Sequence, residues 1–259
     1  MVMQTTEKVR FEISDGLGVI TLARPDKLNA LDKDMRREFG AILAAAAEDA
    51  QIRVVLLRAD GRAFCTGADM SAAPQSPLAW RERVLLAQSH HMQIVRMQKP
   101  VIAAVQGIAL GGGASLALAA DILVMADDAK LIFPFTRLGL VPDGGAAALL
   151  QAKSSPAIAL DVLLSGGELT AHEAAAVGLT RRVVPAASLD EDALALARQL
   201  LELPAEGLVL TKALISHGWT TNLPNALAHE ADALALAATT TGHRDAIARL
   251  RGKIELRKK

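Results

Sequence analysis

The chain has 259 residues, of which 51% are hydrophobic, enough for one large domain with a sizeable core. Lysine plus arginine and aspartate plus glutamate number 28 each, so the formal net charge is zero, and aromatic residues make up only 3%. A neutral chain with few aromatics argues against a nucleic-acid-binding protein, because affinity for phosphates needs a basic surface.

The cellular setting is indicated by what the sequence lacks. Cys65 is the single cysteine, so no intrachain disulfide can form, and a reducing compartment is the simplest expectation. The amino-terminal segment has no apolar signal core, and no apolar run reaches the ~20 residues of a membrane span. We therefore expect a cytoplasmic protein that does not bind a membrane.

The first half of the chain alternates strand and helix patterns. Strands are predicted at 9–13, 18–23, 54–58, 101–105, 121–126 and 130–133. Helices are predicted after Asp32 as N-cap, from Leu78 to Met97, and from the glycine run Gly111–Gly113 to Ala120. The second half reads as almost wholly helical, with capping-box spacing at Thr170 and Ser188. This order predicts an α/β core followed by a carboxy-terminal helical region.

Two glycine-containing turns each follow a predicted buried strand. One contains residues 64–70, FCTGADM, and the other is Gly111–Gly113. Glycine allows positive φ and close backbone approach, and the first N–H groups of a helix are left without partners. Two main-chain N–H groups brought together from such turns would form an oxyanion hole. The charge of a thioester enolate is concentrated on one oxygen, which is what two converging amides can stabilise.

Several motifs in order resemble the crotonase superfamily, the enoyl-CoA hydratases and isomerases. They are FCTGADM at 64–70, KPVIAAVQGIALGGG at 99–113, ADILVMADDAKLIFP at 120–134, LGLVPDGG at 138–145 and LSGGELTAHEAAAVGLTRRVVP at 164–185. The resemblance implies a crotonase-like spiral of ββα units over residues 1–200 and a helical trimerisation region over 201–259. It also implies a homotrimer or a dimer of trimers.

The resemblance further implies a coenzyme A thioester substrate, with no metal or redox cofactor. The oxyanion amides would be those of Thr66 and Gly112. The backbone of Ala68, Asp69 and Met70 would contact the adenine end of coenzyme A. Arg24 and Lys27 stand where the family has basic groups near pantetheine and the phosphates, although both also fit ordinary solvated loop charge.

The sequence departs from the hydratases at two positions. A hydratase carries one glutamate shortly after the triple glycine and another before the later turn, because one carboxylate activates water while the other handles the α-carbon proton. The matching residues here are Ser115 and Phe135, both placed at the acyl pocket. Ser115 could hydrogen-bond a water but is a poor base, and it also fits a small helix residue that faces the preceding turn. Phe135 can only shape or dry the pocket.

One acid remains in the right neighbourhood. Asp143 stands where some family isomerases have their catalytic aspartate, and burial beside an acyl chain would raise its pKa toward that of a general base. The alternative is that Asp143 is the N-cap of the helix that follows it.

The favoured hypothesis is therefore an enoyl-CoA isomerase that shifts a double bond through a dienolate. An enoyl-CoA hydratase is the alternative within enzymes, and a non-catalytic acyl-CoA-binding or assembly subunit is the alternative outside them.

Overall fold

The computed structural model describes residues 8–72, 74, 76–220 and 223–256. Its larger sheet has six strands in the spatial order β1 (Val9–Ser14), β2 (Leu17–Leu22), β3 (Val54–Ala59), β4 (Val101–Val105), β6 (Ile122–Ala126) and β9 (Val183–Val184). Only β1 runs antiparallel to its neighbour. Strands β2 and β4 are buried at every position, as expected for parallel strands covered on both faces.

A second sheet has three strands in the order β5 (Ile108–Leu110), β7 (Lys130–Ile132) and β8 (Glu168–Thr170). Strands β4 and β5 precede helix α3 (Gly112–Ala119), and β6 and β7 precede helix α4 (Ala146–Lys153). Each repeat thus adds one strand to each sheet before its helix, as in the predicted ββα spiral. Strands β5, β8 and β9 were not predicted, because two or three residues are too few to establish an alternating pattern.

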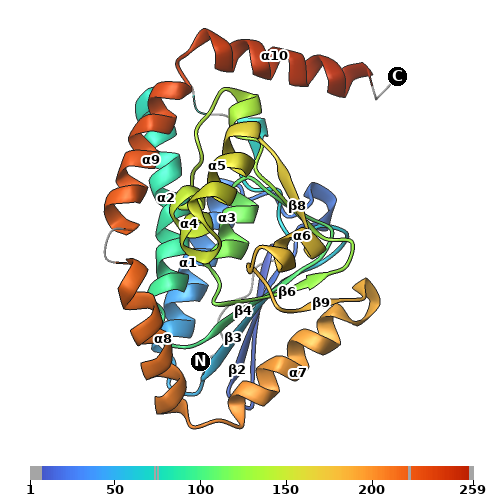
Figure 1. The fold of residues 1–259 in the computed structure, drawn as a ribbon, viewed down its shortest axis with the longest axis vertical. Helices are drawn as coiled ribbons and strands as arrows, with labels where there is room; N and C mark the ends of the chain where they lie inside the picture. The colour runs from blue at the N-terminus through green and yellow to red at the C-terminus, as the bar shows by residue number, and fades with distance from the viewer. Residues whose placement is uncertain (1–7, 73, 75, 221–222, 257–259) are drawn as a thin grey trace.

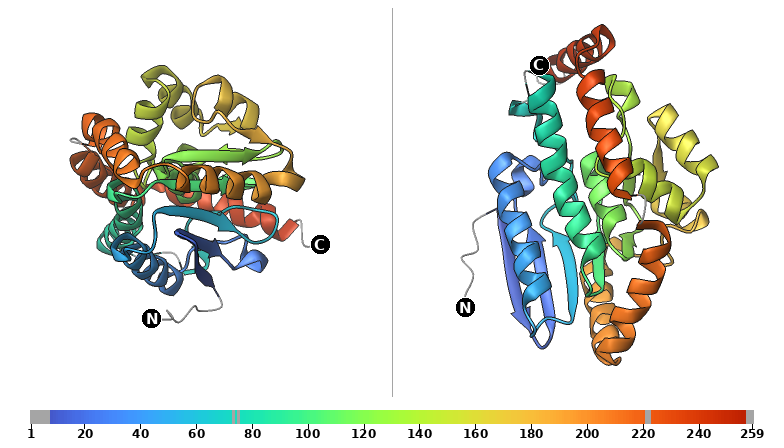
Figure 2. Two further views of the ribbon diagram at one scale, coloured as in Figure 1. Left: turned by 90° about the horizontal axis from the view of Figure 1, so that it is seen from below. Right: turned by 90° about the vertical axis from the view of Figure 1, so that its left-hand side faces the viewer.

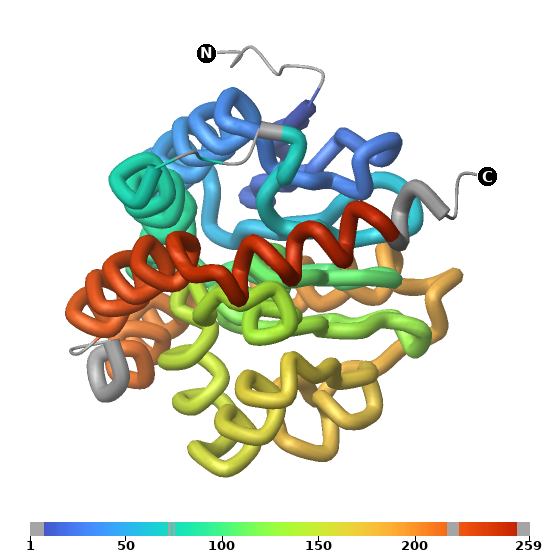
Figure 3. The backbone as a smooth tube through the Cα atoms, turned by 90° about the horizontal axis from the view of Figure 1, so that it is seen from above, coloured from blue at the N-terminus to red at the C-terminus, as the bar shows by residue number. Residues whose placement is uncertain are grey.

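The remaining helices surround the two sheets. They are α1 (Lys33–Glu48), α2 (Pro77–Arg96), α5 (Pro156–Ser165), α6 (Ala171–Ala176), α7 (Leu189–Leu201), α8 (Ala205–Thr220), α9 (Leu223–Ala237) and α10 (Thr241–Leu256). Helix α7 packs on β3, β4 and β6, and α9 lies along α2 (Figures 1 and 2). Helix α10 crosses one end of the molecule (Figure 3). Among the described residues, no helix is both long and apolar enough to cross a membrane.

Local capping agrees with the sequence at two of three predicted helix starts. Asp32 accepts the N–H of Met35 at 2.9 Å, and Thr170 forms a reciprocal capping box with Glu173. The helix start predicted at Ser188 is confirmed, because α7 begins at Leu189. The predicted capping box is absent: the Ser188 side chain caps no backbone N–H and instead donates to Asp192 Oδ2 at 2.7 Å. A short 3₁₀ turn over Ala186–Ser188 leads into α7, which gives Ser188 a φ of −105° and ψ of 1° in place of the extended N-cap backbone.

Candidate active site

The triple glycine lies where β5 meets α3. Gly111 has φ of 56°, and α3 begins at Gly112, whose N–H is among those left without a partner in the first turn. A Cβ added at Gly113 would lie 2.1 Å from the carbonyl oxygen of Cys65. Both the turn and the close approach therefore require glycine.

The two predicted glycine turns are in contact. Gly67 has φ of 76°, and a Cβ built on it would lie 2.9 Å from the nitrogen of Gly112. The backbone N–H of Leu110 donates to the carbonyl of Cys65 at 2.9 Å, which fixes the two segments side by side. The expectation that these turns meet is confirmed by this geometry.

The prediction that Thr66 supplies an oxyanion amide is wrong. Its N–H already donates to the carbonyl of Leu28 at 3.1 Å, so it is not open to a ligand. Two residues further along, the N–H of Ala68 donates to no group in the described part of the chain. The N–H groups of Ala68 and Gly112 can therefore donate to a new partner.

Asp143 lies on the turn before α4 and faces the triple glycine. Its Oδ1 would be 3.7 Å from a Cβ built on Gly112. This oxygen is buried and has no hydrogen-bond partner in the described part of the structure. Burial raises the pKa of Asp143 to about 6, while the charges of Arg36 and Arg83 act in the opposite direction. The carboxyl can therefore exchange a proton near neutral pH.

The alternative role of Asp143 as a helix cap is wrong. The N-cap of α4 is Gly145, with φ of 82°, and no side chain caps this helix start locally. At the start of α4, the backbone N–H of Ala146 donates to the backbone carbonyl of Asp143 and not to its carboxylate. The Asp143 side chain is therefore not needed for the helix.

Side chains from three helices hold the backbone of this turn. The Ser115 hydroxyl of α3 donates to the carbonyl of Asp143 at 2.8 Å. The His91 Nδ1–H of α2 donates to the carbonyl of Gly144 at 2.9 Å, and burial lowers the pKa of His91 to about 3, so the ring is neutral. From α9, Glu230 Oε2 accepts the N–H of Gly145 at 2.7 Å. The position of the acid thus depends on residues far apart in sequence.

Glu230 is a site residue that sequence reasoning missed. It is 9% exposed, and burial raises its pKa to about 8, with the backbone N–H of Gly145 opposing the shift. The spacing of apolar residues in α9 could have indicated it. Glu230 lies on the buried face of this helix together with Leu223, Leu227 and Leu234. A carboxyl at a core position needs a hydrogen-bond donor, and here the donor is the turn after Asp143.

The two residues predicted at the acyl pocket both contact the glycine turn. Ser115 is fully buried, and its hydroxyl also lies 3.2 Å from the carbonyl oxygen of Gly111, so the side chain joins the two turns. This agrees with its alternative role as a small helix residue that faces the preceding turn. Phe135 is 5% exposed and packs against Gly111, and its role in the acyl pocket stays a prediction.

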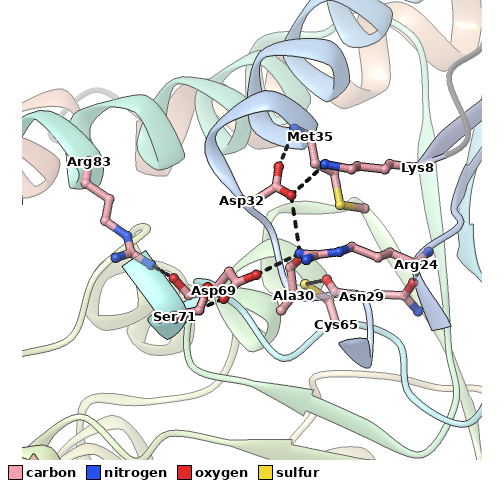
Figure 4. A network of polar contacts seen from close by, with 10 residues as sticks. All are labelled: Lys8, Arg24, Asn29, Ala30, Asp32, Met35, Cys65, Asp69, Ser71 and Arg83. Carbon is pink, nitrogen blue, oxygen red and sulfur yellow. Dashed lines mark hydrogen bonds and ion pairs between the residues drawn. The ribbon is translucent and has the colours of Figure 1, made fainter. Parts of the chain in front are cut away.

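The residues predicted to contact coenzyme A differ in whether their side chains are already bound within the protein. Arg24 donates to Asp69 at 2.8 Å and lies 3.4 Å from Asp32, which in turn binds Lys8 at 2.7 Å (Figure 4). Arg24 is therefore engaged in an ion-pair network, and neither expectation for it, a phosphate contact or a solvated loop charge, describes its side chain. Lys27 and Met70 are exposed and open to a ligand.

The other candidates are structural. Hydrogen bonds to Ser71 and Arg24 lower the pKa of Asp69 to about 2 and close its turn. Asp121 accepts the N–H of Val101 and binds Lys212 at 2.6 Å. Burial raises the pKa of the Cys65 thiol to about 11, so this thiol is not a nucleophile at neutral pH.

A cavity of about 360 Å³ adjoins this site. It lies between the start of α1, the turn after β3 and the first half of α2, and its lining includes Leu31, Arg36, Asp69, Ala79, Arg83 and Leu86. Asp143 does not line this cavity, but the charges of two of its lining residues, Arg36 and Arg83, act on the Asp143 carboxyl. A larger cavity of about 720 Å³ under α8 is lined by none of the turn residues, so it belongs to another part of the molecule.

Comparison with known proteins agrees with this geometry. A family model described as enoyl-CoA hydratase/isomerase matches residues 12–250. A probable enoyl-CoA hydratase of Rhodobacter capsulatus is 38% identical over 86% of each chain, and the 1,2-epoxyphenylacetyl-CoA isomerase of Escherichia coli is 32% identical over 93% of this chain and 94% of its own. An enoyl-CoA hydratase from Mycobacterium avium subsp. paratuberculosis superposes with a TM-score of 0.87 at 31% identity, covering 94% of this chain and 99% of its own.

The chain therefore belongs to the enoyl-CoA hydratase/isomerase family, whose members are enzymes that act on acyl-CoA thioesters. The crotonase-like fold predicted from the motifs is confirmed.

Proposed function

We propose that the protein is an enoyl-CoA isomerase, which moves a double bond from the 3,4 to the 2,3 position of an acyl-CoA thioester. The observation that carries the proposal is the Asp143 carboxyl, whose Oδ1 is buried, lacks a hydrogen-bond partner and faces Gly112. A single base in this position suits a reaction that removes one proton and returns it.

The proposed mechanism uses two parts of the site. The thioester carbonyl oxygen accepts hydrogen bonds from the N–H groups of Ala68 and Gly112. The Asp143 carboxylate then takes a proton from C2. The C2–H electron pair forms a C1=C2 bond and the carbonyl π pair moves onto the thioester oxygen, which gives a dienolate that keeps the C3=C4 bond. As the carbonyl re-forms, the C1=C2 pair shifts to make the C2=C3 bond, and the C3=C4 pair takes the proton back from the same carboxyl at C4. Coenzyme A is part of the substrate, and no metal or redox cofactor takes part.

Asp143 is suited to both halves of this reaction because its pKa is raised to about 6. A carboxylate with an ordinary pKa would be a weaker base toward an α-proton. A pKa near the working pH lets the group both accept and return the proton. Burial supplies the shift, and Oδ1 has no partner among the described residues that would compete for a proton.

Hydration of a 2-enoyl-CoA is the alternative within the family. It needs a second acid–base group facing the substrate, and the positions that carry one in hydratases hold Ser115 and Phe135. Glu230 is the nearby carboxyl that could replace them. Its Oε2 accepts the N–H of Gly145, and its Oε1 is buried with no partner among the described residues. Isomerisation is preferred because it needs Asp143 alone, and the Glu230 variants below test the alternative.

The test is Asp143→Asn, with 3-hexenoyl-CoA and crotonyl-CoA as substrates. The natural protein is expected to form the conjugated 2-enoyl thioester from 3-hexenoyl-CoA without adding water to crotonyl-CoA. Removing the base should lower kcat roughly 10²- to 10⁴-fold. Stability should not fall, because the side chain caps no helix. Asp161→Asn, on the exposed face of α5, is the matched control and should be as active as the natural protein.

Three outcomes would overturn the assignment. Unchanged turnover in Asp143→Asn excludes this carboxyl as the base. Hydration of crotonyl-CoA at the rate of isomerisation favours a hydratase. Retention of hexanoyl-CoA with neither reaction identifies a binding subunit.

A further inference from the structure

Arg36 is a buried cation that the proposed reaction does not use. It lies in the first turns of α1 and is 5% exposed. In the described part of the chain, its guanidinium forms no hydrogen bond and no ion pair. A guanidinium has five N–H donors in a planar fork, and burial without acceptors is costly. An arginine with free N–H donors at the wall of a cavity can bind a hydrogen-bond acceptor of a ligand that enters the cavity.

The acids around Arg36 do not supply that acceptor. Asp32 is bound by Lys8 and Arg24, and Asp69 is bound by Arg24 and by the N–H of Ser71. Asp143 acts on Arg36 through its charge but forms no hydrogen bond with it. Glu82 and Lys33, which also line the cavity, are exposed.

A second arginine lines the same cavity. Arg83 of α2 donates to the carbonyl of Asp69 at 2.6 Å and lies 5.7 Å from the centre of the Trp80 ring (Figure 4 shows the contact with Asp69). Burial and the charge of Arg36 both lower the pKa of Arg83, so the two guanidinium groups are close enough to repel each other. Two like charges at one cavity wall are stabilised by an anion between or beside them.

Part of the remaining wall fits a hydrocarbon chain. Leu31, Ala79 and Leu86 contribute apolar surface to this cavity of about 360 Å³. The other lining residues are Asp32, Lys33, Asp69, Ser71, Pro74 and Glu82. An acyl chain that starts at the thioester beside Asp143 would run along this apolar surface and end near the arginines.

We propose that Arg36 binds a carboxylate at the far end of the acyl chain, so that the substrates of this enzyme are ω-carboxyacyl-CoA thioesters. The proposal rests on the proposed use of this cavity for the acyl group. The planar fork of Arg36 matches the two oxygens of a carboxylate, and charge-assisted bidentate pairs are the strongest hydrogen bonds of this kind. Arg83 adds positive charge to the same wall without leaving its bond to Asp69.

Binding of unreactive thioesters tests this without relying on turnover. Adipoyl-CoA and hexanoyl-CoA have the same chain length, and neither has a double bond to move. Calorimetry should show that the natural protein binds adipoyl-CoA roughly 10- to 100-fold more tightly than hexanoyl-CoA, the range for one charge-assisted interaction. Succinyl-, glutaryl- and suberoyl-CoA, each with its methyl-ended counterpart, give the chain length at which the preference is greatest.

Arg36→Met should abolish that preference and change hexanoyl-CoA binding less than threefold. Arg36→Lys keeps the charge without the fork and should retain part of the preference. Arg37→Met is the matched control, because Arg37 is exposed on the same helix, and it should bind like the natural protein. Circular dichroism of each variant shows that it is folded.

Equal affinity of the natural protein for both members of every pair overturns the carboxylate proposal. A loss in Arg36→Met that is the same for both members also overturns it, and assigns Arg36 to the charge balance of Asp143. If only the isomerase assignment is wrong, the protein still binds the carboxylate-ended thioesters more tightly but forms no 2-enoyl thioester from 3-hexenoyl-CoA.

Discussion

The turn at Gly111–Gly113 and the turn at Asp143–Gly145 each precede a helix, yet they are built in different ways. The first works through its backbone: Gly111 takes a positive φ, and the N–H of Gly112 is left open at the start of α3. The second presents a side chain, and its backbone is held by Ser115, His91 and Glu230 from three other helices. An amide donor can thus be placed by local geometry, whereas an acid has to be aimed by tertiary contacts.

The largest expected effect comes from breaking the first turn with Gly113→Ala. The added Cβ would lie 2.1 Å from the carbonyl oxygen of Cys65, which belongs to a backbone pinned against β5. Such overpacking has no flexible side chain to absorb it, so the free energy of unfolding should fall by about 3 kcal/mol or more. Chemical denaturation measures this.

Gly178→Ala is the control for Gly113→Ala. Nothing lies within 4 Å of a Cβ built at Gly178, although its φ of 86° adds backbone strain. It should cost about 1 kcal/mol. A Gly113→Ala protein as stable as this control would show that the two glycine turns are not in tight contact.

A smaller effect is expected from Glu230→Ala, which loosens the second turn from behind. It leaves the N–H of Gly145 without its acceptor, and an unsatisfied buried donor costs about 1–3 kcal/mol. Turnover should fall as well, since the Asp143 backbone is no longer held. Thermal unfolding and kcat on 3-hexenoyl-CoA measure the two effects.

Glu230→Gln separates positioning from chemistry. The pKa of Glu230 is raised to about 8, so the natural side chain is neutral at pH 7 and glutamine reproduces its shape and its acceptor. This variant should keep the stability and kcat of the natural protein. Inactive but stable Glu230→Gln would instead make Glu230 a proton-transfer group and support the hydratase alternative.

The smallest expected effect is the loss of activity at acid pH, measured as the dependence of kcat/KM on pH. Burial raises the pKa of Asp143 to about 6, so the base is protonated below that pH and kcat/KM should fall about tenfold per pH unit. Because the folded state binds this proton more tightly than the unfolded chain, the contribution of Asp143 to stability rises as the pH falls from 6 toward 4. Lost activity at pH 5 without any loss of thermal stability would agree with this. An acid limb near pH 4 would show that Oδ1 is not buried in the working enzyme.

Much of the site could be predicted because it depends on short stretches. Glycines that need positive φ, such as Gly67 and Gly111, and the motif around them can be read from neighbouring residues. The replacement of both hydratase carboxylates by Ser115 and Phe135 was also visible. The error at Thr66 arose because neighbouring residues do not show whether its N–H is free. That N–H donates to the carbonyl of Leu28, which lies 38 positions away in the sequence.

The amino-acid sequence by itself determined the family, the order of strands and helices, and the presence of a lone acid after the triple glycine. Only the tertiary structure decided that the Asp143 carboxyl is buried and caps no helix, that Glu230 holds its turn, and that Arg36 has no partner among the described residues. The physical reason is range. Backbone conformation and capping are set within a few residues, whereas burial, pKa and hydrogen-bond satisfaction depend on groups that meet only when α1, α2, α3 and α9 pack around the same turn.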